Sequence, residues 1–222
     1  MGGARDEGKL VFHTGVSGAG AIALSRSCLD FSLFGSLTFR KSSVILIRLF
    51  SVAPQDPGIR DPHLTDLGQH QAAAVARVLL PLRLKRLIAS PYIRALETAA
   101  IIAEHLDLPI TVEPLIAERF CFACDIGSPL DELRARWPNL AFDHLPDPWW
   151  PQAEEPLAAI ARRSERFRRR IINEAWPEIA LVTHWGFIRA LTGLTVPNGA
   201  VLRVDPTHSD CAPEIIFVPD RD

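Results

Sequence analysis

The sequence predicts an α/β fold of three layers, in which a mostly parallel central sheet lies between two layers of helices. Short apolar runs rich in β-branched residues, such as VILI at 44–47, suit strands that are covered on both faces. Segments with the periodicity of amphipathic helices alternate with these runs, and parallel strands need such crossover connections. With 222 residues, the chain is long enough to bury the core of one domain of this kind.

Two of the predicted helices start at residues suited to a helix N-terminus. Thr65 is the predicted N-cap of a helix over 64–80, because its hydroxyl can accept a hydrogen bond from the first turn. Ser90 takes the same place for a helix over 90–106, with Pro91 at the first helical position, where a missing N–H is tolerated. The other predicted elements are strands at 44–48, 86–90, 109–112 and 178–184, helices near 129–137, 156–175 and 185–193, and edge strands at 200–204 and 214–218.

The chain divides into an extension and a domain. Residues 1–43 are rich in Gly and Ser and their apolar residues follow no period, so we expect them to be poorly structured or packed on the surface. The domain spans 44–222 and contains an irregular, lid-like insertion at 113–155. Trp149 and Trp150 in this insertion either cap a pocket or pack onto the domain.

Composition limits the class of protein. The net charge of −2 argues against nucleic-acid binding, and no apolar run is long enough to span a membrane. The N-terminus lacks the unbroken apolar core of a signal peptide, and four cysteines in a chain of this length predict no disulfide framework, so we expect a cytoplasmic protein. The C-x-x-C from Cys121 to Cys124 has no second pair of ligands for zinc, so we expect neither a metal nor a cofactor.

Three predicted strand ends carry polar residues that suit one kind of ligand. Arg48 ends the first strand, Arg94 lies in the first turn of the helix after the second, and His184 ends the fourth. In a parallel sheet these ends meet at one edge, which would bring together two guanidinium groups, an imidazole and helix N-termini. Such groups bind phosphoryl oxygens, so the sequence predicts a phosphate site at this edge. The alternative is that each residue pairs with a nearby carboxylate.

The segment RRSERFRRR at 162–170 places six arginines in the long predicted helix. On a helix they spread around the exposed side, and Glu165 is placed to pair with Arg169 at i,i+4. We interpret the segment as a solvated face; the alternative is a surface for an acidic partner.

Six segments of the sequence resemble, in the same order, the motifs of one family. They are VILIR, DPHLTDLGQHQA, IASPYIRALETAAIIAEHL, PLIAER, EEPLAAIARR and LVTHWGFIRALTG, and together they span nearly everything from Val44 to Gly193. The family is the histidine phosphatase superfamily of phosphoglycerate-mutase-like proteins. The resemblance implies a phosphoglycerate-mutase-like fold and the scaffold of a phosphoric monoester hydrolase.

The resemblance also implies roles for four residues. Arg48 and Arg94 would hold the phosphate, His184 would hydrogen-bond the phosphoryl group during transfer, and Glu118 would protonate the leaving oxygen. Physical chemistry is consistent with these roles, because phosphoryl transfer depends mostly on positioning and charge stabilisation, and a leaving alkoxide needs a proton donor.

The sequence departs from the family at the residue that carries the chemistry. The family has Arg-His-Gly or Arg-His-Ala after its first strand, and that histidine attacks phosphorus. Here the segment reads Arg48-Leu49-Phe50, and leucine has no lone pair with which to attack. His63, on the following loop, is a candidate substitute, although its position is typical of a solvent-exposed histidine.

Two functions follow from this departure. The first is a protein that binds a phosphate ester at the two-arginine pocket and is catalytically impaired because Leu49 replaces the nucleophile. The alternative is an active phosphomonoesterase that uses a substitute nucleophile, direct attack by water, or a histidine at position 49 that the present sequence has as leucine. A purely structural domain is a third option, favoured if Arg48, Arg94 and His184 have internal partners. The expected ligand is a phosphorylated small molecule or a phosphoprotein.

Removal of residues 1–43 is expected to leave the domain folded, because this segment lacks periodicity and lies outside the resemblance. A chain that starts at Lys41, and so lacks all but the last three of these residues, should melt within a few degrees of the full chain, as measured by circular dichroism. An insoluble or molten product would show that the apolar stretch LDFSLFGSLTF belongs to the core.

Overall fold

The structure, a computed structural model, describes four segments of the chain. They are residues 44–48, 58–173, 178–207 and 212–219. All four belong to one unit of the chain, residues 37–222. The predicted extension over 1–43 and the residue at the expected place of the nucleophile, Leu49, lie outside the described residues.

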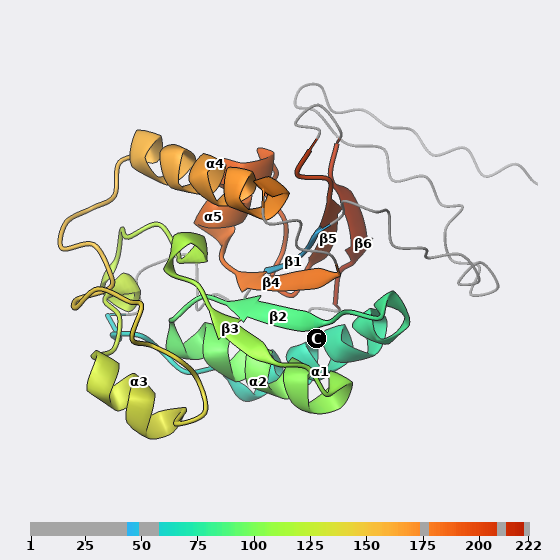
Figure 1. The fold of residues 1–222 in the computed structure, drawn as a ribbon, viewed down its shortest axis with the longest axis horizontal. Coiled ribbons are helices and arrows are strands. Elements are labelled where there is room, and N and C mark those ends of the chain that lie inside the picture. The colour runs from blue at the N-terminus through green and yellow to red at the C-terminus, as the bar shows by residue number, and fades with distance from the viewer. Residues whose placement is uncertain (1–43, 49–57, 174–177, 208–211, 220–222) are drawn as a thin grey trace, which may run out of the picture. The chain divides into compact units, whose positions relative to one another are not determined.

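The sheet has six strands in the order β3–β2–β4–β1–β5–β6 (Figure 1). β1 to β4 pair in parallel, whereas β5 pairs with β1 and with β6 in antiparallel fashion, which confirms a mostly parallel sheet. β5 was expected at an edge but lies between β1 and β6, so β6 forms that edge instead. The strands are β1 (Val44–Arg48), β2 (Arg86–Ala89), β3 (Ile110–Val112), β4 (Ile179–Thr183), β5 (Val201–Val204) and β6 (Glu214–Phe217).

Helices cover both faces of the sheet, with α1 and α2 on one side and α4 and α5 on the other (Figure 1). The α-helices are α1 (Asp66–Leu79), α2 (Ile93–Leu106), α3 (Leu130–Arg136), α4 (Leu157–Asn173) and α5 (Trp185–Thr192), and the 3₁₀ helices are η2 (Leu80–Leu82), η3 (Pro114–Ile116) and η4 (Ala123–Asp125).

Successive side chains of β1 point to opposite faces of the sheet and so belong to different parts of the core. Ile45 and Ile47 belong to the cluster that includes the buried side chains of α1 and α2, whereas Val44 and Leu46 belong to the cluster of α4 and α5. All four side chains are buried. The predicted three-layer α/β fold is therefore confirmed.

The two predicted N-caps had different outcomes. Thr65 caps α1 as expected, since its hydroxyl accepts a hydrogen bond from the N–H of Gly68 at 3.1 Å. The prediction of Ser90 as the cap of α2 is wrong, because Tyr92 is the N-cap and the helix starts at Ile93. A carboxylate distant in sequence supplies the missing acceptor: Asp61 accepts from the N–H of Ile93 at 2.9 Å. Periodicity cannot reveal a cap that comes from another part of the chain.

The lid-like insertion packs against the domain through its tryptophans. The indole N–H of Trp149 donates to the carbonyl of Ser128 at 2.9 Å, and its ring lies edge-on to Tyr92 with the centroids 4.8 Å apart. Trp149 is buried, and Trp150 lies half-buried below the guanidinium of Arg60. Of the two interpretations of these tryptophans, packing onto the domain is the one that the contacts favour.

Candidate functional site

The register of the sheet brings three strand ends together. Arg48 at the end of β1 pairs with Thr183 at the end of β4, and β2 lies on the other side of β4. The N–H of Ser90, just after β2, donates to the carbonyl of Val182 at 3.1 Å. His184 directly follows β4 as the N-cap of α5, so it lies between the ends of its two neighbouring strands.

His184 is buried and neutral in character. One ring nitrogen, Nε2, shares a hydrogen bond of 2.8 Å with the hydroxyl of Ser90, and the ring meets Tyr92 edge-on at 5.2 Å. Burial holds the pKa of His184 well below its ordinary value, and the positive charges of Arg94 and Arg163 lower it further. The imidazole is therefore suited to hydrogen bonding rather than to carrying a positive charge.

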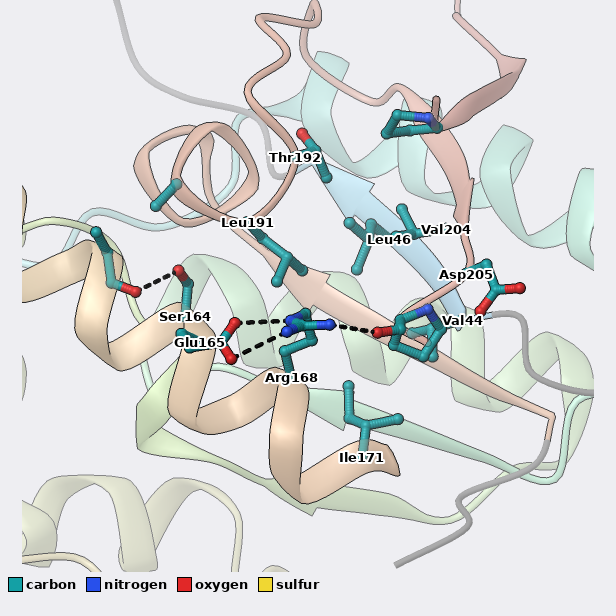
Figure 2. Close-up of a pocket in the computed structure, with 14 residues that line it drawn as sticks. Val44, Leu46, Ser164, Glu165, Arg168, Ile171, Leu191, Thr192, Val204 and Asp205 are labelled. Atoms are coloured by element: carbon teal, nitrogen blue, oxygen red, sulfur yellow. Dashed lines mark hydrogen bonds and ion pairs between the residues drawn. The ribbon is translucent and has the colours of Figure 1, made fainter. Parts of the chain in front are cut away.

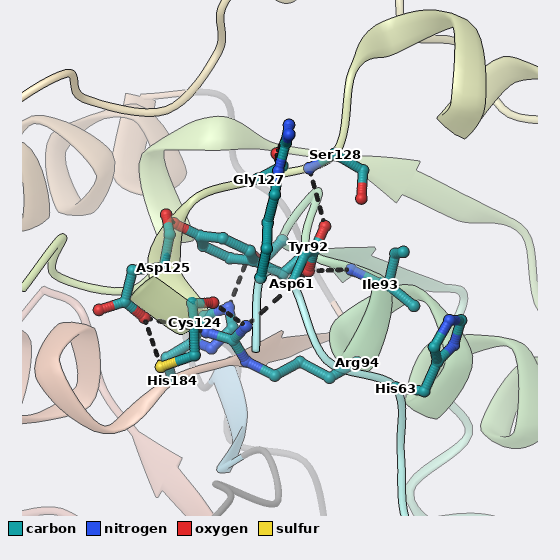
Figure 3. Close-up of polar contacts among 12 residues, drawn as sticks. Asp61, His63, Tyr92, Ile93, Arg94, Cys124, Asp125, Gly127, Ser128 and His184 are labelled. Atoms are coloured by element: carbon teal, nitrogen blue, oxygen red, sulfur yellow. Dashed lines mark hydrogen bonds and ion pairs between the residues drawn. The ribbon is translucent and has the colours of Figure 1, made fainter. Parts of the chain in front are cut away.

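Arg94 is buried within a network of internal partners (Figure 3). It donates to the carbonyl of Cys124 at 2.9 Å and to the carboxylate of Asp125 at 3.3 Å, and Asp61 lies 3.8 Å away. Its guanidinium also stacks over the ring of Tyr92 at 4.3 Å. Arg94 is thus rigidly placed, and two carboxylates already balance part of its charge.

Arg48 differs from Arg94 in its surroundings. Its Nε atom is buried and has no hydrogen-bond partner within the part of the chain that the structure describes. Burial lowers the pKa of Arg48, while the carboxylate of Glu118 acts in the opposite direction. Arg48 as a whole is half-buried, and a buried charged donor without a partner is costly, so Arg48 is the residue most suited to receive an anion.

Glu118 follows η3 and faces the same edge of the sheet. Its Oε1 accepts hydrogen bonds from the N–H groups of Arg119 at 2.7 Å and of Gly186 at 2.8 Å. Burial raises the pKa of Glu118 above its ordinary value, although both N–H groups and Arg94 act against this rise. A raised pKa means that the carboxyl group keeps its proton to a higher pH than usual, which suits it to donate that proton to a leaving oxygen.

Sequence reasoning missed Asp125, which organises the other side of Arg94. Its second oxygen, Oδ2, accepts from the N–H groups of Cys121 at 3.0 Å and of Phe122 at 3.1 Å. The C-x-x-C segment therefore contributes backbone groups to the site and places a carboxylate there. Within the described segments, no group of three or more His, Cys, Asp or Glu residues could hold a metal ion.

The candidate substitute nucleophile, His63, has a different environment (Figure 3). Its Nδ1 lies 2.7 Å from the carboxylate of Glu97, which also pairs with Arg136, and the histidine side chain is exposed. His63 is not among the hydrogen-bond partners of Arg94 or His184.

A separate cavity of about 240 Å³ lies between α4, α5 and the strands β1 and β5 (Figure 2). Val44, Leu46 and Arg168 are among the residues that line it. The guanidinium of Arg168 is bound by the carboxylate of Glu165 and by the carbonyl of Pro206.

No helix among the described residues has the length and apolar character needed to cross a membrane.

An alanine at position 186 is expected to displace the Glu118 carboxyl group. A Cβ atom on Gly186 would lie 2.3 Å from Glu118 Oε1. The free energy of unfolding should fall by about 1–3 kcal/mol, the usual cost of overpacking, although alanine alone favours a helix by about 1 kcal/mol over glycine. Urea denaturation would measure the change.

The same substitution in a Glu118→Ala background provides the control. Most of the destabilisation should vanish there, because the colliding oxygen is gone. An equal loss of stability in both backgrounds would show that Glu118 does not depend on Gly186.

Comparisons of the sequence with known proteins point to one family. The model of the histidine phosphatase superfamily (branch 1) matches residues 55–209. A probable phosphatase of Schizosaccharomyces pombe is 30% identical over 163 residues, which cover 67% of this chain and 74% of that protein. A glucosyl-3-phosphoglycerate phosphatase of Mycolicibacterium vanbaalenii is 29% identical over 158 residues, which cover 65% of this chain and 70% of that protein.

Solved structures show the same fold. The ecdysone phosphate phosphatase of Bombix mori, in complex with tungstate, superimposes with a TM-score of 0.58 at 17% identity, over 81% of this chain and 95% of that one. A putative alpha-ribazole-5'-P phosphatase of Escherichia coli gives a TM-score of 0.53 at 23% identity, over 73% and 90% of the two chains. The predicted phosphoglycerate-mutase-like fold is confirmed, and the chain belongs to the histidine phosphatase superfamily.

Proposed function

We propose that this chain binds a phosphate ester at the edge of the sheet formed by Arg48, Arg94 and His184, and that hydrolysis is impaired because Leu49 replaces the nucleophile. The observation that carries the binding proposal is the buried Nε of Arg48, which lacks a partner among the described residues. An anionic oxygen at this point would satisfy the donor and compensate the buried charge.

The neighbours of Arg48 support a phosphoryl ligand in particular. Ser90 and His184 form a hydrogen-bonded pair at the adjacent strand ends, and Arg94 lies in the first turn of α2. Two guanidinium groups beside a helix N-terminus match the several oxygens of a phosphate better than the two of a carboxylate. Glu118, with its raised pKa, is the proposed donor of a proton to the leaving oxygen.

The names of the relatives support a phosphorylated small molecule over a phosphoprotein. The mycobacterial relative is a glucosyl-3-phosphoglycerate phosphatase, so its name describes the ester of a small molecule. We extend only this chemical class to the present chain.

Leu49 determines whether binding leads to turnover. Loss of the nucleophile from a coupled catalytic set costs on the order of 10⁴- to 10⁶-fold in rate. The alternative, an active phosphomonoesterase, is favoured by the retention of a proton donor in Glu118 and by the phosphatases among its relatives.

Phosphate binding should depend on Arg48. Inorganic phosphate is expected to bind the Arg48→Gln variant about 10- to 100-fold more weakly, as expected for a lost charged hydrogen bond of about 1.5–3 kcal/mol. Isothermal titration calorimetry would measure the affinity, with Arg94→Lys as a second variant.

Arg134→Gln is the matched control, because Arg134 pairs with Asp143 on the exposed surface of α3. Its affinity for phosphate should equal that of the parent chain. Phosphate affinity that is unchanged in both Arg48→Gln and Arg94→Lys would remove this site.

Leu49→His should raise the rate of hydrolysis of p-nitrophenyl phosphate by at least about 100-fold. This gain is smaller than the full loss of rate that a missing nucleophile causes. The additional change Phe50→Gly should increase the rate further, because the family has Gly or Ala there. The variant should also trap an acid-labile, base-stable phosphohistidine. Leu49→Gln, which is polar but cannot attack, serves as the control.

If the parent chain already hydrolyses the ester as fast as both histidine variants, Leu49 is not a catalytic lesion. The active alternative would then replace the proposal of an impaired phosphatase.

A further inference from the structure

One arginine of the long helix α4 is largely covered by protein instead of forming part of a solvated face. The side chain of Arg163 is 12% exposed, whereas that of Arg169 on the same helix is 73% exposed. Arg163 follows Ile160 by three residues and precedes Phe167 by four, and both of these side chains are buried. It therefore lies on the inner face of α4, toward the segment that carries Glu118.

The guanidinium of Arg163 holds this segment by its backbone. Nη1 donates to the carbonyls of Leu115 at 2.7 Å and of Ala117 at 2.8 Å, and Nη2 donates to the carbonyl of Glu118 at 3.2 Å. The hydroxyl of Thr183 binds the remaining carbonyl of the run, that of Ile116, at 2.6 Å. Four consecutive carbonyl groups are thus fixed by side chains that belong to α4 and β4.

A carboxylate in turn orients Arg163. Glu155 accepts from Nε at 3.0 Å and from Nη2 at 2.7 Å, which is the two-point pairing of a guanidinium with a carboxylate. Glu155 is itself buried, and its N–H donates to the carbonyl of Phe120 at 2.8 Å. Both ends of the segment around Glu118 are therefore tied to the same ion pair.

We propose that Arg163, oriented by Glu155, is the positioning residue that holds Glu118 as the proton donor, an inference that rests on the function proposed above. Ala117 and Glu118, which follow η3, belong to no helix or strand, so no ladder of backbone hydrogen bonds fixes them. Without Arg163, the carbonyls of Leu115, Ala117 and Glu118 would lose this donor, and the segment would open to water. The contact between the carboxyl of Glu118 and the N–H of Gly186 would then be lost.

Charge alone does not explain this role. A lysine offers a single ammonium group, which cannot reach three carbonyls and pair with a carboxylate in the planar geometry of a guanidinium. The charged groups that face Glu118 are Arg48 on β1, Arg94 on α2 and Asp125 on η4. Arg163 itself contacts the backbone of Glu118 and acts on the carboxyl group through its position.

The first test compares leaving groups in the Leu49→His background. An alkyl phosphate such as glycerol phosphate needs a proton donor, whereas p-nitrophenyl phosphate has a good leaving group. In Arg163→Met, the loss of kcat for glycerol phosphate should exceed any loss for p-nitrophenyl phosphate by about 10-fold or more. The whole contribution of a general acid, about 10²- to 10⁴-fold, is the upper limit of this difference. Arg163→Lys should show the same selective loss.

Arg168→Met is the matched control, because Arg168 on the same helix also binds a carboxylate and a backbone carbonyl, but beside the separate cavity. Both of its kcat values should be unchanged. Glu155→Gln retains Arg163 but removes the charge that orients it, so kcat for glycerol phosphate should again fall selectively, by a smaller factor. This variant keeps the test usable if Arg163→Met folds poorly.

The second test needs no activity. Carbon-13 NMR of the Glu118 carboxyl group, assigned with Glu118→Gln, reports its pKa in the chain with Leu49 intact. The pKa should lie above the ordinary value in the parent chain and in Arg168→Met, and should return toward the ordinary value in Arg163→Met.

The two proposals fail in different ways. If Leu49→His is inactive while the pKa of Glu118 shifts as expected, the proposed phosphatase chemistry is wrong and the positioning role stands. A pKa of Glu118 that is the same in folded Arg163→Met and Glu155→Gln as in the parent chain would overturn the positioning role.

Discussion

The parallel pairing of β4 with β1 on one side and β2 on the other is the constraint on which the candidate site depends. This pairing sets the ends of three buried strands at one level, so that Arg48, Ser90 and His184 meet although they are far apart in sequence. The strands are held by apolar side chains on both faces, so the backbone that carries these residues is rigid. A shift of one residue in register would turn the side chains of β1 to the opposite face.

Desolvation gives the residues at this edge their separate chemical characters. Burial lowers the pKa of His184 and raises that of Glu118, so for each group it shifts the balance toward the neutral form. Arg94 retains carboxylate partners in Asp61 and Asp125. Arg48 is half-buried, and its buried Nε has no hydrogen-bond partner among the described residues. The arrangement combines a hydrogen-bonding imidazole with a lowered pKa, a carboxyl group with a raised pKa and a guanidinium whose Nε has no hydrogen-bond partner among the described residues.

The sequence allowed us to predict the layers, the placement of polar residues at the strand ends and the family, because these follow from local periodicity and short motifs. It did not reveal the roles of Asp61, Asp125 and Arg163, because each of these residues acts on a partner about 30 or more positions away. One pattern pointed to Arg163: its spacing from Ile160 and Phe167 places it beside the buried stripe of α4. The prediction of a solvated face treated all six arginines alike and therefore missed this distinction. The Ser90 cap was wrong for a related reason, since that hydroxyl instead binds His184.

The carboxylates around Arg94 also determine how strongly the site attracts anions from a distance. Arg48 and Arg94 supply two positive charges, Asp61 and Asp125 supply two negative charges, and the imidazole supplies none. The formal charge of the edge is therefore close to zero before Glu118 is counted, and its long-range electrostatic field is weak. Capture of an anion must rely on short, directed hydrogen bonds formed after contact, and inorganic phosphate would leave without having to escape a strong positive potential.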